Sequence, residues 1–259
     1  MRKIENKFYN TRFLPLLVLA MLVNILAQAW HETGHHIVYQ VMGHEPVWAF
    51  TKVVQMREPP TNPANWVEIT NPDGSSNWLK VSSMPTGKTE KALMAAAGPL
   101  AGLFSAMLGL FISRRSVNST SKQTWLAYTL AISLVAVLYY FRAPIRTGGD
   151  EYDVAVNLGI AKSLVELPLA FGYLVCLIFG LRELSIWKIR LAWLGTIMLG
   201  TIATGIPMAM LDPFIISKVD AGNPLFQPVF GYSLPVLFTI LLTFLGIWAW
   251  SRWQEGASK

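Results

Sequence analysis

The sequence predicts an α-helical polytopic membrane protein with about six transmembrane helices and a small β-rich segment outside the membrane. Of the 259 residues, 53% are hydrophobic and only 14% are charged, whereas about a quarter of the residues of a soluble domain carry charge. Apolar runs long enough to cross a bilayer recur along the chain. We expect spans at residues 13–36, 92–113, 123–141, 164–181, 187–210 and 232–250. Together they predict a single membrane-embedded domain that covers residues 1–259.

Basic residues in the short loops predict how these spans are oriented, because Lys and Arg collect on the cytoplasmic side of membrane proteins. With six spans, one side receives Arg2, Lys3, Lys7, Arg12, Arg114, Arg115, Lys122, Arg182, Lys188, Arg190, Arg252 and Lys259. Arg142 and Arg146 fall on the other side. We therefore expect both termini to be cytoplasmic. Topology then accounts for the net charge of +6, and no basic stripe with interleaved aromatic residues indicates a nucleic-acid partner.

The first span runs into a metal-binding motif. His31-Glu32-Thr33-Gly34-His35 is an HExxH sequence, and residues four apart lie about one helical turn apart on the same face. His31 and His35 can therefore ligate one metal ion, while Glu32 lies where a carboxylate can accept a proton from metal-bound water. Ionisable groups are expensive inside a bilayer and usually mark a function. The alternative is a polar helix end at the membrane interface.

A cleaved signal peptide is an alternative interpretation of the N-terminus. A basic start, an apolar run and Ala27-Gln28-Ala29 imitate a signal segment with its cleavage site. Cleavage there would remove the helix upstream of His31. Because the apolar stretch continues through residues 37–42, we expect the span to be retained.

Two further histidines follow the motif. His36 is five residues after His31, which rotates it by about 140° around a helix and away from the same tetrahedral site. His44 follows Gly43, beyond the expected helix end. We expect both to be interfacial residues or hydrogen-bond donors near the site rather than ligands.

Residues 44–90 form the one long polar segment. Residues 47–56 are apolar and β-branched enough for a strand, while 66–70 and 78–81 alternate polar and apolar residues around a turn at 71–74. We expect a small β-sheet close to the metal motif. An exposed edge of such a sheet can bind an extended peptide through main-chain hydrogen bonds. A solvated loop with one hairpin is the alternative.

Small residues in the second span favour close approach of another helix. Gly98 and Gly102 form a GxxxG pattern among several alanines. Pro99 costs little near the start of a helix. We expect tight helix packing here, which would also bring helices close around the metal.

A third ligand must come from a distant part of the chain, because catalytic zinc takes three protein ligands and keeps one position for water. The topology puts the histidines near the non-cytoplasmic end of the first span. The acidic cluster that returns to that side lies at residues 148–153, followed by a helical pattern at 154–160. We favour Asp150, at the expected first turn, over Asp153. Asp150 also suits a plain N-cap.

Together the HExGH sequence, Ala97-Gly98-Pro99 at the start of a later span and an aspartate that opens another helix resemble the site-2 protease family of intramembrane zinc metalloproteases. The resemblance covers roughly residues 20–165, and residues 182–259 carry no recognised motif. It implies that His31, His35 and Asp150 bind Zn²⁺ and that Glu32 is the catalytic base. The family's third-ligand motif ends in Leu-Asp-Gly, whereas this chain has Thr147-Gly148-Gly149-Asp150-Glu151.

The expected function is zinc-dependent hydrolysis of peptide bonds in membrane-protein substrates, within or near the bilayer. A non-enzymatic membrane protein that stores or senses metal, or carries a relic motif, is one alternative. Another is an ion-coupled transporter that uses Glu32, Asp150, Lys162 and Glu166. Lys162 and Glu166 are four residues apart and can instead pair on one helix face.

Overall fold

Six long helices dominate the computed structural model, which describes residues 13–52, 55–56, 59–60, 62–70, 74, 76–81, 85–142 and 148–257. Within those residues, six helices are long and apolar enough to cross a membrane. They are α2 (Phe13–Val41), α3 (Lys88–Arg115), α4 (Ser119–Phe141), α6 (Lys162–Arg182), α7 (Trp187–Asp220) and α8 (Leu234–Ala257). The predicted class is confirmed: the chain is a helical, multi-pass membrane protein.

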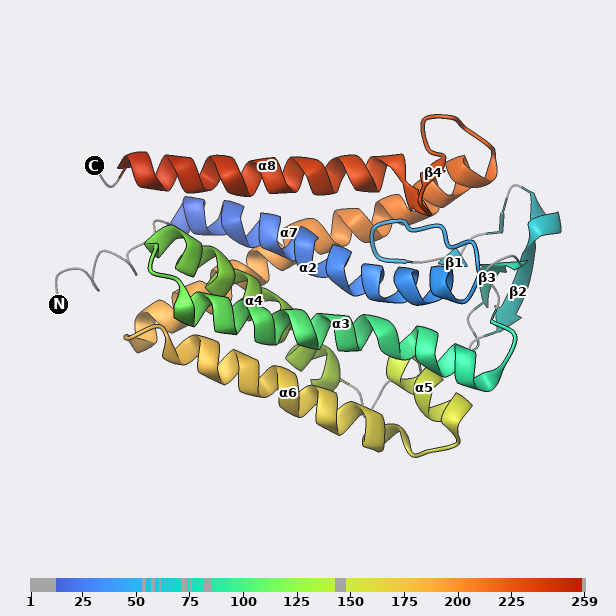
Figure 1. Ribbon diagram of the computed structural model, residues 1–259, viewed down its shortest axis with the longest axis horizontal. Coiled ribbons are helices and arrows are strands. Elements are labelled where there is room, and N and C mark those ends of the chain that lie inside the picture. The colour runs from blue at the N-terminus through green and yellow to red at the C-terminus, as the bar shows by residue number, and fades with distance from the viewer. Residues whose placement is uncertain are drawn as a thin grey trace.

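The helices lie roughly side by side along the long axis of the molecule (Figure 1). The start of α2 and the end of α8 lie at one end of this bundle (Figure 1). The short helix α5 (Asp150–Leu158) and the small sheet lie at the opposite end, next to the last turns of α2. The HExxH motif and the acidic cluster therefore meet at the end that carries the polar segment.

Three helices run well beyond their predicted ends, and one of them is α8, which continues to Ala257. Helix α2 continues to Val41, and α7 continues to Asp220. The extension of α7 is unexpected because Pro207 and Pro213 lie inside α7, and a proline removes a helical hydrogen bond. The added turns are stabilised by burial, since Ile215 and Ile216 are only 2% and 1% exposed.

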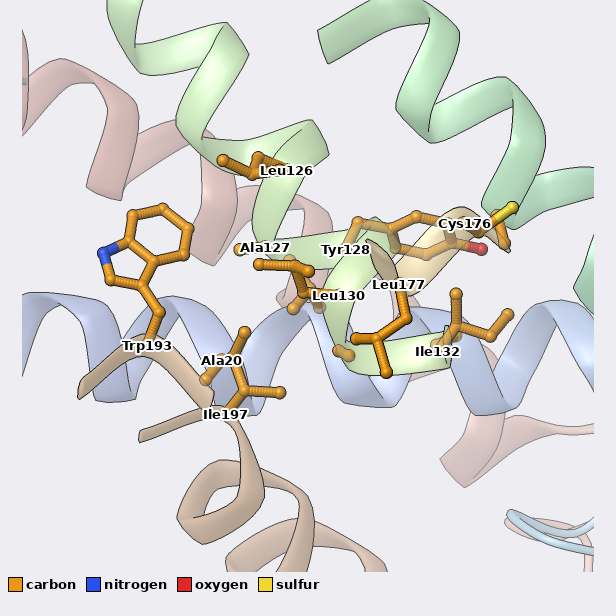
Figure 2. Close-up of a cluster of buried hydrophobic side chains, with 14 of the residues drawn as sticks. Ala20, Leu126, Ala127, Tyr128, Leu130, Ile132, Cys176, Leu177, Trp193 and Ile197 are labelled. Carbon is orange, nitrogen blue, oxygen red and sulfur yellow. The ribbon is translucent and has the colours of Figure 1, made fainter. Parts of the chain in front are cut away.

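The main hydrophobic core joins the membrane helices to one another. It combines side chains of α2, α4, α6 and the first half of α7, among them Ala20, Leu130, Leu177 and Ile197 (Figure 2). Small residues let these helices approach closely: a Cβ on Gly200 of α7 would lie 2.7 Å from the Cβ of Ala20. The first half of α7 is thereby fixed against the helix that carries the metal motif.

A second core lies toward the end of the bundle that carries the sheet. Its buried residues come from five parts of the chain: α2, the segment after α2, the sheet, the second half of α7 and the first turn of α8. They are Ala29, Trp48, Ala49, Phe50, Trp66, Met208, Ile215, Ile216 and Val236. The polar segment is therefore packed against the C-terminal spans.

The predicted sheet is present in the polar segment. Strands β1 (Gln55–Met56), β2 (Trp66–Thr70) and β3 (Ser76–Lys80) pair antiparallel in the order β1-β3-β2. A 3-10 turn, η1 (Pro63–Asn65), precedes β2. Of the predicted turn at 71–74, only Gly74 is described, with φ +80; the other three residues lie outside the described residues.

The prediction of a strand over residues 47–56 is wrong for most of its length. Of the described residues in this range, only Gln55 and Met56 are in a strand, and Trp48 forms an isolated bridge with Tyr232. The backbone N–H groups of Phe50 and Thr51 donate to the Asp212 side chain instead of to a neighbouring strand. A distant carboxylate thus takes the place of a strand partner.

A hairpin that the sequence did not predict connects α7 to α8. Strands β4 (Pro228–Val229) and β5 (Tyr232–Ser233) pair antiparallel. Phe230 and Gly231 between them have φ 52 and 79, as a tight two-residue hairpin turn requires. The Phe230 carbonyl accepts hydrogen bonds from His36 Nε2 at 2.9 Å and Gln40 Nε2 at 2.7 Å, which hold the hairpin against the end of α2.

Candidate metal centre

Three side chains from two distant helices converge at this end of the bundle. His31 Nε2 and His35 Nε2 lie 3.2 Å apart on consecutive turns of α2. Asp150 Oδ2, from the first turn of α5, lies 3.3 Å from each of them. Among the described residues, these three are the group of metal-ligating side chains that could hold one ion. The structure therefore brings together the three residues that the sequence singled out as ligands.

The triangle of ligand atoms fits a small tetrahedral cation. Ligand atoms at about 2.0–2.1 Å around a tetrahedral zinc ion lie about 3.3–3.4 Å from one another. The three observed separations are 3.2, 3.3 and 3.3 Å. Two imidazole nitrogens and one carboxylate oxygen form a donor set that suits zinc and related transition metals better than calcium or magnesium. These residues therefore fit the expected ion.

The ring of His35 is held in place from its other side. His35 Nδ1 donates to the Met94 carbonyl of α3 at 2.6 Å, which leaves Nε2 directed at the metal position. Metal-binding histidines commonly have such a partner on the second ring nitrogen, because it fixes the tautomer and the orientation. His35 is 8% exposed, and residues of α3 contact its ring. The position of the ring therefore depends on how α3 packs against α2.

Two glycines allow α2 and α3 to come this close. A Cβ on Gly34 would lie 2.4 Å from the Ala97 carbonyl oxygen, and a Cβ on Gly98 would lie 2.1 Å from His35 Nε2. Both distances are far inside van der Waals contact. The glycine within HExGH and the glycine of the Ala97-Gly98-Pro99 sequence thus face each other's helices in one α2–α3 contact. The missing side chain of Gly98 leaves the space that the His35 ring occupies.

Asp150 faces the histidines rather than capping its own helix. Gly149 is the N-cap residue of α5, with φ 113, and no side-chain hydrogen bond caps the helix. Burial raises the pKa of Asp150, but the adjacent rings of His35 and His31 lower it further, and the net pKa lies below its usual range. The carboxylate is therefore held in the charged form that ligates metal.

Asp153, the rival ligand, lies outside the triangle of ligand atoms. It is one turn further along α5, and its side chain is exposed. Partial burial in the wall of the site, together with the charges of Asp150 and Glu151, raises the pKa of Asp153 to about 6. Its position next to the ligand explains why the sequence alone left both candidates open.

Glu151, the residue after Asp150, fixes the start of α5 to the end of α4. It is 2% exposed and accepts hydrogen bonds from Tyr140 Oη at 2.5 Å and Tyr139 Oη at 3.0 Å, both at the end of α4. On α6, Tyr173 Oη donates to the Pro99 carbonyl at 2.9 Å. Sequence reasoning missed this cluster. The signal that could have found it was a glutamate beside a candidate ligand and a pair of tyrosines at the end of a span.

Glu32 lies in the same cavity as the three candidate ligands. This cavity has a volume of about 690 Å³ and is lined by residues from α2 to α6 and from the sheet. Glu32 is 5% exposed, and Gln28, one turn earlier on α2, donates to its Oε1 at 2.8 Å. Sequence reasoning also missed Gln28, although its spacing of four residues from Glu32 was visible.

The remaining polar residues singled out from the sequence lie away from the triangle. His36 Nε2 donates to the Phe230 carbonyl, and His44 Nε2 lies 2.9 Å from Glu90 Oε1. Lys162 Nζ pairs with Glu166 Oε1 at 3.0 Å on α6. Lys162 and Glu166 therefore pair on one helix face, which was the alternative to a role in an ion path.

Comparison with protein-family models, curated proteins and solved structures found no match. The function is therefore inferred from the residues of the site.

Proposed function

We propose that this protein is a zinc-dependent endopeptidase that hydrolyses peptide bonds of membrane-protein substrates within or near the bilayer, as the resemblance to the site-2 protease family implies. The observation that carries the proposal is the position of Glu32. A buried carboxylate shares one cavity with a triangle of ligand atoms that fits zinc, at the end of a membrane helix.

His31, His35 and Asp150 would hold the ion and leave its fourth position open to the cavity. Zinc in such a site supplies Lewis-acid chemistry, in that it acidifies water to a pKa of about 7 and polarises a carbonyl oxygen. Met94 keeps His35 in the tautomer that binds metal, since its carbonyl accepts from Nδ1. Glu151 and its two tyrosine partners keep the first turn of α5 in place.

Glu32 would carry the proton during hydrolysis. Its carboxylate accepts a proton from the attacking water as the oxygen of that water bonds to the scissile carbonyl carbon. It then gives the proton to the leaving amine nitrogen as the carbon–nitrogen bond breaks. Gln28 orients the carboxylate through the bond to Oε1, and burial of Glu32 keeps bulk water from competing for the proton.

The sheet supports binding of an extended substrate. Ile69 of β2 and Leu79 of β3 line the same cavity as the candidate ligands, and β2 lies at an edge of the sheet. A substrate helix hides its peptide bonds and must unwind before hydrolysis, and an unwound strand can add to such an edge. Proline substitutions in β2 should then slow cleavage without loss of zinc, and unchanged turnover would contradict this part of the proposal.

Loop charges support a location of the site on the non-cytoplasmic side. An even number of spans leaves both chain ends at one end of the bundle, and most loop Lys and Arg residues belong to that end. Both termini would then be cytoplasmic, and the polar segment would lie outside the cytoplasm. Proteolysis of oriented vesicles tests this, because the segment at residues 44–90 should be cut from the non-cytoplasmic face, whereas the two chain termini should be cut only from the cytoplasmic face.

The test of the proposed activity is the variant Glu32→Gln. We expect it to retain zinc and to lose about 10²–10⁴-fold in cleavage rate, which is the usual contribution of a general base. The assay uses a panel of quenched-fluorescence peptides, each a single apolar span, in mixed lipid–detergent micelles. Glu166→Gln is the matched control, because Glu166 pairs with Lys162 outside the triangle of ligand atoms. Equal cleavage by Glu32→Gln and wild type would favour a metal-storing or relic site.

A further inference from the structure

One carboxylate of α7 is buried without any part in the metal centre. Asp212 is 0% exposed and lies in the second core. Its Oδ1 accepts from the Phe50 N–H at 2.6 Å, and its Oδ2 accepts from the Thr51 N–H at 3.0 Å and from the Thr51 hydroxyl. A charge buried this deeply is costly unless several donors surround it, so these bonds fix where the segment lies.

The segment bound by Asp212 forms part of the wall of the metal cavity. Thr51 and Lys52 line that cavity together with Glu32 and the three candidate ligands. Trp48, two residues before Phe50, is 1% exposed and is held to the α7–α8 hairpin by a bond from its N–H to the Gly231 carbonyl at 3.0 Å. The wall is therefore anchored on its protein side by the C-terminal spans and faces the site on the other.

A second carboxylate of α7 makes a similar attachment at a different place. Asp220, the last residue of α7, accepts from Trp66 Nε1 at 2.8 Å and from the Asn62 N–H at 3.0 Å. Neither Trp66 nor Asn62 lines the metal cavity. Asp220 therefore holds the start of β2 outside the cavity, whereas Asp212 holds residues that line the cavity.

We propose that Asp212 is a positioning residue for substrate binding: it holds Thr51 and Lys52 at the distance from the metal centre that an extended substrate segment requires. This inference deepens the proposed peptidase function and rests on it. It also gives the fifth span a role. That span contributes no ligand to the metal triangle. Through the buried side chain of Asp212 it instead fixes the part of the cavity wall formed by Thr51 and Lys52.

The experiment compares Asp212→Asn with Glu166→Gln, whose carboxylate pairs with Lys162 on α6, using the peptide of the panel that wild type cleaves fastest. The amide retains the shape of the carboxylate but places an NH₂ group against donors. For Asp212→Asn we expect KM to rise about 10-fold, as the loss of hydrogen bonds to a charged group implies. The expected kcat and zinc content match those of wild type. Glu166→Gln should leave KM unchanged.

A binding arm separates this inference from the peptidase proposal, because it needs no turnover. The same peptides are titrated into zinc-loaded Glu32→Gln protein and into the Glu32→Gln, Asp212→Asn double variant. A weaker Kd in the double variant supports the positioning role even when no peptide is cleaved. An equal Kd in the two proteins overturns it, as does a fall in kcat at unchanged KM.

Thr51→Val provides a second route if Asp212→Asn fails to fold. The substitution keeps the volume of the side chain, removes its hydroxyl bond to Asp212 and leaves both backbone donors in place. KM should rise in the same direction but less. Hydrogen exchange at the Phe50 and Thr51 amides should accelerate in Asp212→Asn and stay unchanged in Glu166→Gln. An unchanged KM in Thr51→Val together with unchanged exchange in Asp212→Asn would refute the inference.

Discussion

The N-terminal and C-terminal spans contribute to the site in different ways. Helices α2 and α5 bring the ligand atoms of His31, His35 and Asp150 within 4.8 Å of one another. Helix α3 packs closely against α2 and holds the His35 ring. Helices α7 and α8 supply none of these ligands, yet they hold the segment after α2 through Asp212 and the β4–β5 hairpin.

Under the proposed function, this difference means that metal binding and substrate binding depend on separable parts of one membrane domain. Changes at the α2–α3 contact should affect the metal, whereas changes on α7 should affect the wall of the cavity. Two substitutions test the metal-binding part and a third tests the charge next to it, in order of decreasing expected effect.

The largest effect is expected from Gly98→Ala. A Cβ at this position would lie 2.1 Å from His35 Nε2, against an ordinary contact of 3.4 Å or more, and the Met94 carbonyl prevents the ring from turning away freely. Displacement of a ligand should lower zinc affinity by about 100-fold, the upper end of the range for losing contacts that orient a metal ligand. Competition with a fluorescent zinc chelator measures this.

Gly195→Ala on α7 is the matched control for Gly98→Ala. No heavy atom of the described residues lies within 4 Å of a Cβ at Gly195, and alanine is a better helix former than glycine. Its zinc affinity should equal that of wild type. A Gly98→Ala protein that binds zinc normally would show that α3 does not constrain His35.

Glu151→Gln should have a smaller effect on the same property. The amide can no longer accept from both Tyr139 and Tyr140 with full charge, so the first turn of α5, and with it Asp150, is held less firmly. Loss of such a supporting contact lowers metal affinity by about 10-fold. The same chelator competition measures it, and unchanged affinity would mean that Gly149 and the helix backbone suffice to orient Asp150.

The smallest effect is a pH dependence of stability at Asp153. Its folded-state pKa is raised to about 6 from an ordinary value of 3.8, first by partial burial and then by the charges of Asp150 and Glu151. The folded state therefore binds this proton more tightly, and ionisation lowers stability as pH rises from about 4 through 6. Solvent exposure of the side chain keeps the effect small.

In metal-free protein, Asp153→Asn should therefore raise the unfolding temperature slightly at pH 8 and leave it unchanged at pH 4. Thermal unfolding in detergent at the two pH values checks this. A variant that is less stable than wild type at pH 8 would contradict the assigned shift.

The parts of the site that could be predicted are those encoded by local spacing or by topology. His31 and His35 follow from one turn of helix, and the acidic cluster that contains Asp150 and Asp153 follows from the side of the membrane to which its loop returns. The predicted spans match the six helices because length and hydropathy suffice to define them.

The parts that could not be predicted depend on contacts between distant residues. Asp212 next to Pro213 is typical of a helix end, so the extension of α7 was not visible, nor was the carboxylate that replaces a strand partner for Phe50 and Thr51. Residues 47–56 have strand-like composition, but the backbone N–H groups of Phe50 and Thr51 are bound by a residue more than 150 positions away. No local pattern reports such a pairing.

The zinc content of the purified protein tests the central claim most directly. Wild type should carry about one zinc per chain, His35→Ala and Asp150→Ala should carry none, and Asp153→Ala should match wild type. Zinc retained in Asp150→Ala and lost in Asp153→Ala would contradict the ligand set. A wild type without zinc, purified under conditions that retain metal, would contradict the metal centre itself.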